Sequence, residues 1–213
     1  MTHRYFIAGT DTGVGKTYIA ANLLAGLGQG HRVSGYIKPF QTGCRNIEGM
    51  LASADVGEVK GLLGGDVECH VLHAYELPAC PYLAARKAGA RIDVQSAVEW
   101  TRRTGGRYEV TVVEGAGGLM VPLTEGETIL DFAVGVGYPI ILVTANKLGC
   151  INHSLMSIHI LKERGVDIKA LVLNDLEPVA GDEAAEANAE IIAAFAPGIE
   201  IVRVKHGGDF NLR

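Results

Sequence analysis

Residues 4–17 read Arg-Tyr-Phe-Ile-Ala-Gly-Thr-Asp-Thr-Gly-Val-Gly-Lys-Thr. An apolar strand pattern here runs into a glycine-rich turn, which leads to Lys16, Thr17 and a helical pattern. A turn of this kind presents consecutive backbone N–H groups to a polyphosphate at the start of a helix. The lysine then reaches the outer phosphates, and the threonine hydroxyl holds Mg²⁺. We therefore predict a nucleotide-binding loop.

The rest of the chain alternates short, apolar, β-branched segments with helical patterns. The expected strands are residues 4–8, 33–37, 110–113, 139–144, 170–173 and 200–204, and the expected helices are residues 16–27, 54–63, 81–88, 94–103, 129–136, 152–164 and 183–195. Strands that are apolar on both faces belong to a parallel sheet covered by helices. The alternation predicts right-handed crossovers. We expect residues 1–213 to form one α/β domain of the P-loop NTPase-like type, a mostly parallel, doubly wound sheet with helices on both faces.

Composition narrows the class of protein. The chain has 213 residues, 48% of them apolar, and a net charge of −5. This acidic balance argues against a nucleic-acid partner, which favours a basic surface. No apolar run reaches the roughly 18 residues of a membrane span, and the N-terminus lacks a signal-peptide pattern. Four cysteines without close paired spacing indicate reduced thiols. We expect a cytoplasmic protein.

A possible metal site is suggested by Cys69, His70 and His73, which lie close together in the sequence. Structural metal sites usually bring a second pair of ligands further along the chain, and none follows here. We therefore expect a polar loop with incidental histidines at this place.

In a doubly wound sheet, ligands bind beyond the carboxyl ends of the strands. Lys38 follows the second expected strand, where it can face the same crevice as Lys16 or simply be solvated. Glu114 follows the third, in a glycine-rich Glu-Gly-Ala-Gly-Gly segment, and an acid at this place can hold Mg²⁺. Asp55 near a helix start is either a second metal carboxylate or an acid stabilised by the helix dipole.

Two later segments are candidates for ligand contacts. The helix start around residues 149–153 offers free N–H groups to a carboxylate, although Asn152 there can equally be a helix cap. Asn146-Lys147 is similar to the guanine-reading motif of GTPases, but Gly149 replaces its aspartate. Asn174-Asp175, after the fifth expected strand, is the better reader of an adenine edge.

Taken together, these segments resemble the dethiobiotin synthetase family. The resemblance rests on residues 9–17, 38–43 (Lys-Pro-Phe-Gln-Thr-Gly), 114–118, 147–153 (Lys-Leu-Gly-Cys-Ile-Asn-His) and 174–175. Segment 147–153 is the most specific of them. Gly9 stands one residue further from Gly15 than in the common phosphate loop, and this longer form is typical of the family.

The resemblance implies an ATP- and Mg²⁺-dependent ligase of biotin biosynthesis that converts 7,8-diaminononanoate and CO₂ to dethiobiotin. The implied intermediates are a carbamate and a carbamic-phosphoric mixed anhydride. It also implies a homodimer, in which residues 149–152 bind the carboxylate tail of the substrate in the active site of the neighbouring subunit.

The resemblance further assigns roles to single residues. It implies catalytic roles for Thr12, Lys16 and Lys38; nucleotide contacts for Gly13, Val14, Gly15, Lys16, Thr17, Tyr18, Asp55, Glu114, Gly115, Ala116, Gly117, Asn174 and Asp175; metal binding by Thr17, Asp55 and Glu114; and substrate contacts for Thr42, Gly149, Cys150, Ile151 and Asn152. The tail after Val204 departs from the family, because it lacks a proline-containing segment near the adenine.

Two other classes of protein share the phosphate loop. Partition and targeting ATPases, which act as nucleotide-driven switches, carry a signature lysine five residues before the loop lysine, where this chain has Asp11. Amidoligases of cobalamin synthesis carry a fused glutaminase domain, for which 213 residues leave no room. Both alternatives therefore fit the sequence less well.

Overall fold

A computed structural model describes residues 2–28, 33–64, 67–179, 181–210 and 212. The strands are β1 (His3–Gly9), β2 (Ser34–Gln41), β3 (Arg45–Ile47), β4 (Met50–Ala52), β5 (Glu68–Ala74), β6 (Val110–Gly118), β7 (Ile140–Ala145), β8 (Ile168–Asn174) and β9 (Ile201–Val204). The helices are α1 (Lys16–Leu27), α2 (Ala54–Leu63), α3 (Pro81–Lys87), α4 (Val94–Gly105), α5 (Ile129–Val136), α6 (Cys150–Glu163) and α7 (Glu183–Phe195).

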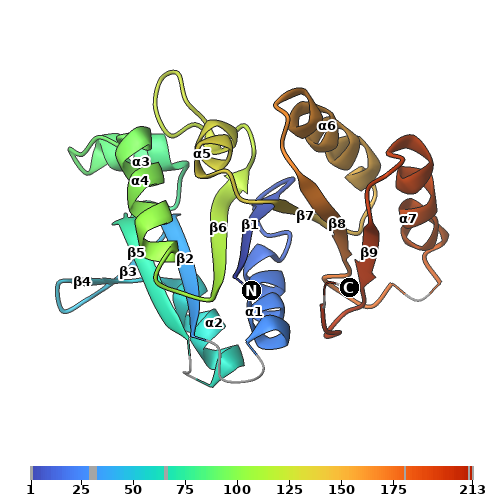
Figure 1. Ribbon diagram of the computed structural model, residues 1–213, viewed down its shortest axis with the longest axis horizontal. Coiled ribbons are helices and arrows are strands. Elements are labelled where there is room, and N and C mark those ends of the chain that lie inside the picture. Colours follow the sequence, from blue (N-terminus) through green and yellow to red (C-terminus); the bar gives the residue numbers. More distant parts are fainter. Residues whose placement is uncertain (1, 29–32, 65–66, 180, 211, 213) are drawn as a thin grey trace.

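Within these described residues, seven strands form one sheet in the order β5-β2-β6-β1-β7-β8-β9. Every neighbouring pair in that sheet is parallel. Strands β3 and β4 form a separate antiparallel hairpin. The hairpin projects near β2 and β5 at one side of the molecule, whereas β9 and α7 lie at the opposite side (Figure 1). The predicted α/β class with a parallel sheet is confirmed.

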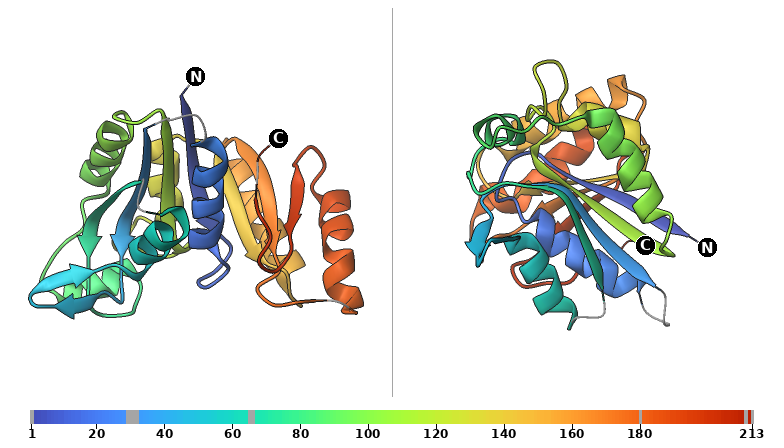
Figure 2. Two further views of the ribbon diagram at one scale, coloured as in Figure 1. Left: turned by 90° about the horizontal axis from the view of Figure 1, so that it is seen from below. Right: turned by 90° about the vertical axis from the view of Figure 1, so that its left-hand side faces the viewer.

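Helices cover both faces of the sheet because successive strand residues point to opposite sides. In β1, Phe6 belongs to an apolar core shared with α4, α5 and α6, whereas Ile7 belongs to a second core shared with α1 and α2. The pattern repeats in β7, where Leu142 faces the first core and Val143 the second. Figure 2 shows α1 and α2 together on one side of the sheet. The doubly wound prediction is therefore confirmed.

Several predicted boundaries were wrong in a systematic way. Strand β2 continues to Gln41 and β6 to Gly118, so Lys38 and Glu114 lie within strands rather than after them. The expected polar loop around residues 69–73 is instead part of the edge strand β5, which pairs with β2. Helix α6 begins at Cys150, two residues before the predicted start. The functional residues themselves interrupt the apolar pattern by which the strands were recognised.

The carboxyl ends of β1, β2, β6, β7 and β8 meet at one edge of the sheet, since all of these strands run in the same direction. The phosphate loop leaves this edge from β1 and enters α1. In the described part of the chain, no helix combines the length and apolar character needed to span a membrane.

Candidate active site

The glycine-rich loop between β1 and α1 is a tight turn that only glycine accommodates at two positions. Gly13 and Gly15 have positive φ angles of 71° and 90°, a region that other residues adopt at a steric cost. A Cβ atom on Gly15 would also collide with the Asn174 side chain. Lys16 folds back over the loop, and its Nζ donates to the Asp11 carbonyl oxygen at 2.8 Å. The side chain of the predicted loop lysine therefore lies against the backbone of the turn.

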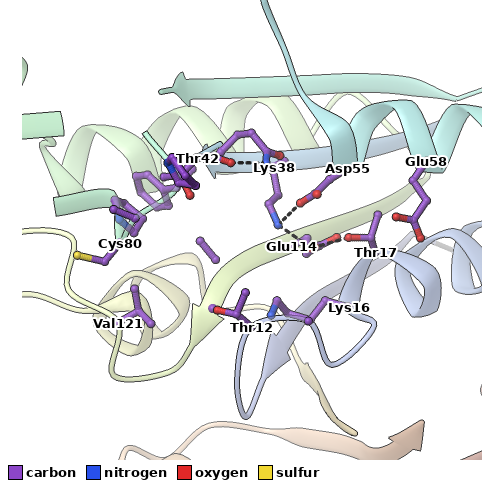
Figure 3. A pocket seen from close by; sticks show the side chains of 18 of the residues that line it. Thr12, Lys16, Thr17, Lys38, Thr42, Asp55, Glu58, Cys80, Glu114 and Val121 are labelled. Carbon is purple, nitrogen blue, oxygen red and sulfur yellow. Dashed lines mark hydrogen bonds and ion pairs between the residues drawn. The ribbon is translucent and has the colours of Figure 1, made fainter. Parts of the chain in front are cut away.

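The second predicted lysine is the centre of a charged cluster. Lys38 Nζ lies 2.6 Å from Asp55 Oδ2 and 2.6 Å from Glu114 Oε1, and it also donates to the Gly115 carbonyl oxygen at 3.1 Å. Thr17 Oγ1 donates to the same Glu114 oxygen at 3.1 Å. In Figure 3, Lys38 comes from β2, and Lys16 comes from the start of α1 on the other side of the pocket. The two lysines and two carboxylates predicted from separate segments are therefore gathered at one place.

The charged side chains of Lys38 and Glu114 are buried, which is unusual for ionised groups. Lys38 is 4% exposed and Glu114 is 1% exposed. Burial alone would lower the pKa of Lys38, but the charges of Glu114 and Asp55 outweigh it and raise that pKa above its usual value. For Lys16, burial and the nearby Lys38 ammonium lower the pKa to about 8. Lys38 therefore stays protonated, whereas Lys16 loses its proton at a lower pH than an ordinary lysine does.

Tyr36 is a buried residue of this cluster that the sequence analysis missed. Its hydroxyl donates to Glu114 Oε2 at 2.7 Å. Burial and the Glu114 charge raise the pKa of Tyr36 well above its usual value, so its phenol keeps the proton it donates. Alternation along β2 places Tyr36 on the same face as Lys38, because residues two apart point to the same side of a strand. It does not show that Tyr36 reaches Glu114, which lies on another strand.

The cluster lines a pocket of about 730 Å³. Of the predicted residues, Thr12, Gly13, Gly15, Lys16, Thr17, Lys38, Thr42, Asp55, Glu114, Ala116 and Gly117 line it. Residues that sequence reasoning did not single out complete the lining: Phe40, Gln41, Glu58, Pro78, Ala79, Cys80, Pro81 and Val121. Thr42 and Cys80 lie together at one end of the pocket, and Glu58 lies near Thr17 at the other (Figure 3).

Two of these unpredicted residues have recognisable settings. Gln41 ends β2, and its Oε1 accepts from Ser53 Oγ at 2.7 Å, which ties the end of the strand to the capping residue of α2. Glu58 lies on α2 one turn after Asp55, on the same side of the helix. Burial, together with the charges of Asp55 and Glu114, raises the pKa of Glu58. The spacing of Asp55 and Glu58 was the one sequence signal for the latter.

Other predicted nucleotide ligands lie around the pocket rather than in its lining. Asn174 is buried, and its side-chain amide donates to the Val14 carbonyl oxygen at 3.1 Å. This hydrogen bond helps to fix the backbone of the loop. Asp175 accepts from Asn146 Nδ2 at 2.6 Å and from Arg203 Nε at 3.0 Å. The Tyr18 hydroxyl donates to the carbonyl oxygen of Gly208 in the C-terminal tail at 3.0 Å.

The predicted substrate residues 149–152 lie at the start of α6 and do not line the pocket of their own chain. Gly149, with φ 92°, occupies the N-cap position, so the alternative that Asn152 caps the helix was wrong. Cys150 is buried, whereas Asn152 is exposed. The neighbouring Leu148 is 92% exposed. Asn152 and Leu148 are therefore accessible to another molecule, whereas Cys150 is not.

Oxygen ligands for a divalent cation converge at the charged cluster. Thr17 Oγ1 and the Asp55 and Glu114 carboxylates supply the hard oxygen atoms that Mg²⁺ prefers, and both carboxylates reach the same Lys38 ammonium. Among the described residues, no group of three or more His, Cys, Asp and Glu side chains could hold a metal ion. Two carboxylates and a hydroxyl nevertheless fit Mg²⁺, which usually binds one or two carboxylates together with phosphate oxygens.

Comparison with solved structures supports the fold. The septum site-determining protein MinD from Pyrococcus horikoshii OT3, solved with Mg-ADP, matches with a TM-score of 0.61 at 18% identity, covering 96% of this chain and 82% of that chain. A ParA family ATPase from Chlorobium tepidum TLS also has a TM-score of 0.61, at 16% identity, covering 97% and 85%. At these identities the likeness shows a shared fold only.

Sequence comparison is more specific. A family model described as AAA domain matches residues 3–204. The ATP-dependent dethiobiotin synthetase BioD of Anaeromyxobacter sp. (strain Fw109-5) is 36% identical over 171 residues, which cover 79% of this chain and 75% of that protein. The match to this relative agrees with the resemblance carried by the sequence motifs. The chain belongs to the AAA-domain family and, within it, to the family of ATP-dependent dethiobiotin synthetases.

Proposed function

We propose that this protein, acting in the cytoplasm, is an ATP- and Mg²⁺-dependent ligase that makes dethiobiotin from 7,8-diaminononanoate and CO₂. The family membership supports the overall reaction. The observation that carries the proposal is the pocket in which Lys16, Lys38, Asp55 and Glu114 meet. Beyond them the pocket continues to Thr42, which leaves room for an acceptor beside the phosphates.

The proposed reaction has three steps. One amine of the diamine adds to the carbon of CO₂ and loses a proton, which gives a carbamate. A carbamate oxygen then attacks the γ-phosphorus of ATP, and ADP leaves. The second amine attacks the carbonyl carbon of this mixed anhydride, phosphate leaves with the bonding electron pair, and the amine loses a proton as the ureido ring closes.

The chain's own contribution is chiefly positive charge in a fixed place. A carbamate and a γ-phosphate repel each other, and the ammonium groups of Lys16 and Lys38 offset that repulsion from opposite sides of the pocket. All three protons of the Lys38 ammonium have acceptors here, namely Asp55, Glu114 and the Gly115 carbonyl oxygen. Lys38 must therefore exchange one of these acceptors for a substrate oxygen during the reaction.

The other residues of the site are assigned separately to the metal, the nucleotide and the acceptor. Thr17, Asp55 and Glu114 would hold Mg²⁺, which when bound supplies charge neutralisation at the phosphate oxygens. Backbone N–H groups of the loop at Gly13–Tyr18 would bind the phosphates, and Thr12 and Thr42 would contact the acceptor. Asn174 and Asp175 remain our proposed contacts on the adenine side. Because residues 149–152 lie outside the pocket lining of their own chain, we assign them to the substrate carboxylate in a second subunit of a homodimer.

The test is phosphate release from MgATP, measured with the diamine, bicarbonate, both or neither. The proposal predicts release only when both substrates are present. ATP hydrolysis that is indifferent to the diamine would contradict it and would favour a nucleotide-driven switch of the partition ATPase class.

A further inference from the structure

Glu114 is held through both of its carboxylate oxygens. Oε1 faces the pocket, where it accepts from Lys38 Nζ at 2.6 Å and from Thr17 Oγ1 at 3.1 Å. Oε2 accepts from the Tyr36 hydroxyl at 2.7 Å. Tyr36 thus occupies one oxygen and leaves the other turned towards the phosphate loop. With a partner on each oxygen, the carboxylate cannot rotate without breaking a hydrogen bond to a buried group.

The strand register explains why the phenol reaches this carboxylate. Tyr36 of β2 is the parallel partner of Val112 in β6, and Glu114 follows Val112 by two residues on the same face. Tyr36 is fully buried in the core beneath α1 and α2, and its backbone is fixed between β5 and β6. The hydroxyl is therefore presented from a rigid part of the sheet and not from a loop.

A glutamate at this place needs such a support more than an aspartate does. The extra methylene of glutamate adds one rotatable bond, so the carboxylate has more accessible rotamers. Ordering it in one of them therefore costs more conformational entropy. Asp55, by comparison, has a shorter side chain and lies at the first turn of a helix. A ligand orientation that is not fixed costs affinity and rate even when the ligand itself is present.

We propose that Tyr36 is a positioning residue, whose phenol fixes the Glu114 carboxylate in the orientation that binds the divalent cation. The proposal rests on the function proposed above, since it requires Glu114 to be a metal ligand. Tyr36 does not line the pocket, so it would act on the cation only through Glu114.

The first test is Tyr36→Phe, which removes only the hydroxyl. We expect its affinity for Mn²⁺, measured by electron paramagnetic resonance with protein in excess over ADP, to fall by about tenfold, the lower end of the range for lost support of a metal ligand. Affinity for metal-free ADP should stay the same, and kcat should fall while the KM for the diamine does not change. Wild-type affinity for Mn²⁺ would overturn the proposal.

Tyr108→Phe is the matched control. Tyr108 is also buried, and its hydroxyl also donates to a glutamate, Glu68, at 2.6 Å. This pair lies at the start of β5 and β6, opposite the end of the strands that carries the pocket. We expect Tyr108→Phe to bind Mn²⁺ as the wild type does. An equal loss of affinity in both variants would mean a general structural effect and would overturn the proposal.

A double-mutant cycle with Glu114→Gln separates this proposal from the function beneath it. If Tyr36 acts through Glu114, Tyr36→Phe should weaken Mn²⁺ binding much less in the Glu114→Gln background than in the wild type. An undiminished effect there would overturn the inference. Wild-type Mn²⁺ affinity in Glu114→Gln alone would overturn the metal role of Glu114, and the inference with it. Weakened binding in Glu114→Gln with no change in Tyr36→Phe would overturn the inference alone.

Discussion

At the scale of single residues, the pocket holds charges where a protein interior disfavours them. Lys38 and Glu114 are almost completely buried, and removing each ion from water costs several kcal/mol that its partner must offset. The buried Lys38–Glu114 pair is therefore weak evidence that these residues stabilise the fold. Because the pair lines the same pocket as the phosphate loop, a role in catalysis explains it better.

Lys38→Ala should reduce turnover by a factor of about 10² to 10³ or more, because it removes a charge aimed at the transferring phosphoryl group. Affinity for MgATP, measured by calorimetry, should stay within about tenfold, or about 1.4 kcal/mol, since Lys16 and the loop amides remain. Lys169→Ala, which removes an exposed lysine, is the control and should be fully active. Loss of MgATP binding in Lys38→Ala would instead make Lys38 a nucleotide ligand.

Several residues of the site could be predicted because their chemistry is visible in short motifs. The loop lysine and Thr17 follow directly from the glycine pattern, and both line the pocket. Tyr36 could not be recognised in the same way, because a tyrosine in an apolar strand looks like any core residue. Its role depends on the pairing of β2 with β6, between which the chain runs through β5 and several helices. That pairing is a property of the fold and not of any local pattern.

At the scale of elements, the helices could be predicted more accurately than the strands. The bounds of α1, α2, α5 and α7 agree with the expected residue ranges, since their ends carry caps or glycines. Strand β5 was missed, because its polar residues Cys69, His70 and His73 lack the apolar run of a central strand. It is stable as an edge strand, where only one neighbour and partial burial are required.

Helix α5 permits a test of pH dependence. Asp131 accepts from the backbone N–H of Thr128 at 2.8 Å and from its hydroxyl at 2.7 Å, and it pairs with Arg164 at 2.9 Å. Partial burial raises the pKa of Asp131, but these hydrogen bonds outweigh it and lower the pKa below its usual value. Its stabilising contribution is therefore complete above the unfolded pKa, about 3.9, and is lost as the pH falls through the lower folded pKa.

Asp131→Asn should accordingly lower the free energy of unfolding at pH 7 by about 1 kcal/mol, because it weakens the capping box that Asp131 forms with the N-cap residue Thr128. The difference from the wild type should shrink as the pH falls below about 4. Urea unfolding across this pH range measures it. Asp167→Asn, at an exposed carboxylate, should differ little from the wild type at any pH. A difference for Asp131→Asn that grows towards low pH would contradict the assigned sign.

At the scale of the whole molecule, the C-terminal tail returns to the phosphate-loop helix. Phe210 is buried in the core beneath α1, and its backbone N–H donates to Asn22 Oδ1 at 3.3 Å. The tail also accepts from Tyr18 of α1. From the sequence, this tail could be described only as divergent, because its glycines do not indicate where it packs.

Phe210→Ala should therefore destabilise the protein by about 3–5 kcal/mol, the usual range for a buried phenylalanine. Thermal or urea unfolding of the nucleotide-free protein measures this loss. Phe195→Ala is the matched control: Phe195 is 73% exposed, and its change should stay within about 0.5 kcal/mol. Equal stability of Phe210→Ala and the wild type would mean that the tail does not anchor α1.

The proposed homodimer predicts an unequal effect on the two substrates. Asn152→Ala should raise the KM for the diamine by more than the KM for ATP, because Asn152 lies at the start of α6 and outside the pocket of its own chain. Mixing this variant with Lys38→Ala should restore activity at low diamine concentration, since mixed dimers then contain one intact site. Equal effects on both KM values, without restoration on mixing, would contradict a shared site.

The most direct test of the proposed reaction follows the carbon atom that CO₂ supplies. The protein is incubated with MgATP, ¹³C-bicarbonate and 7,8-diaminononanoate, and the product is identified by mass while phosphate is counted. We predict ¹³C-labelled dethiobiotin in a one-to-one ratio with the phosphate released. Phosphate release without a labelled cyclic product, or at a rate independent of the diamine, would contradict the account.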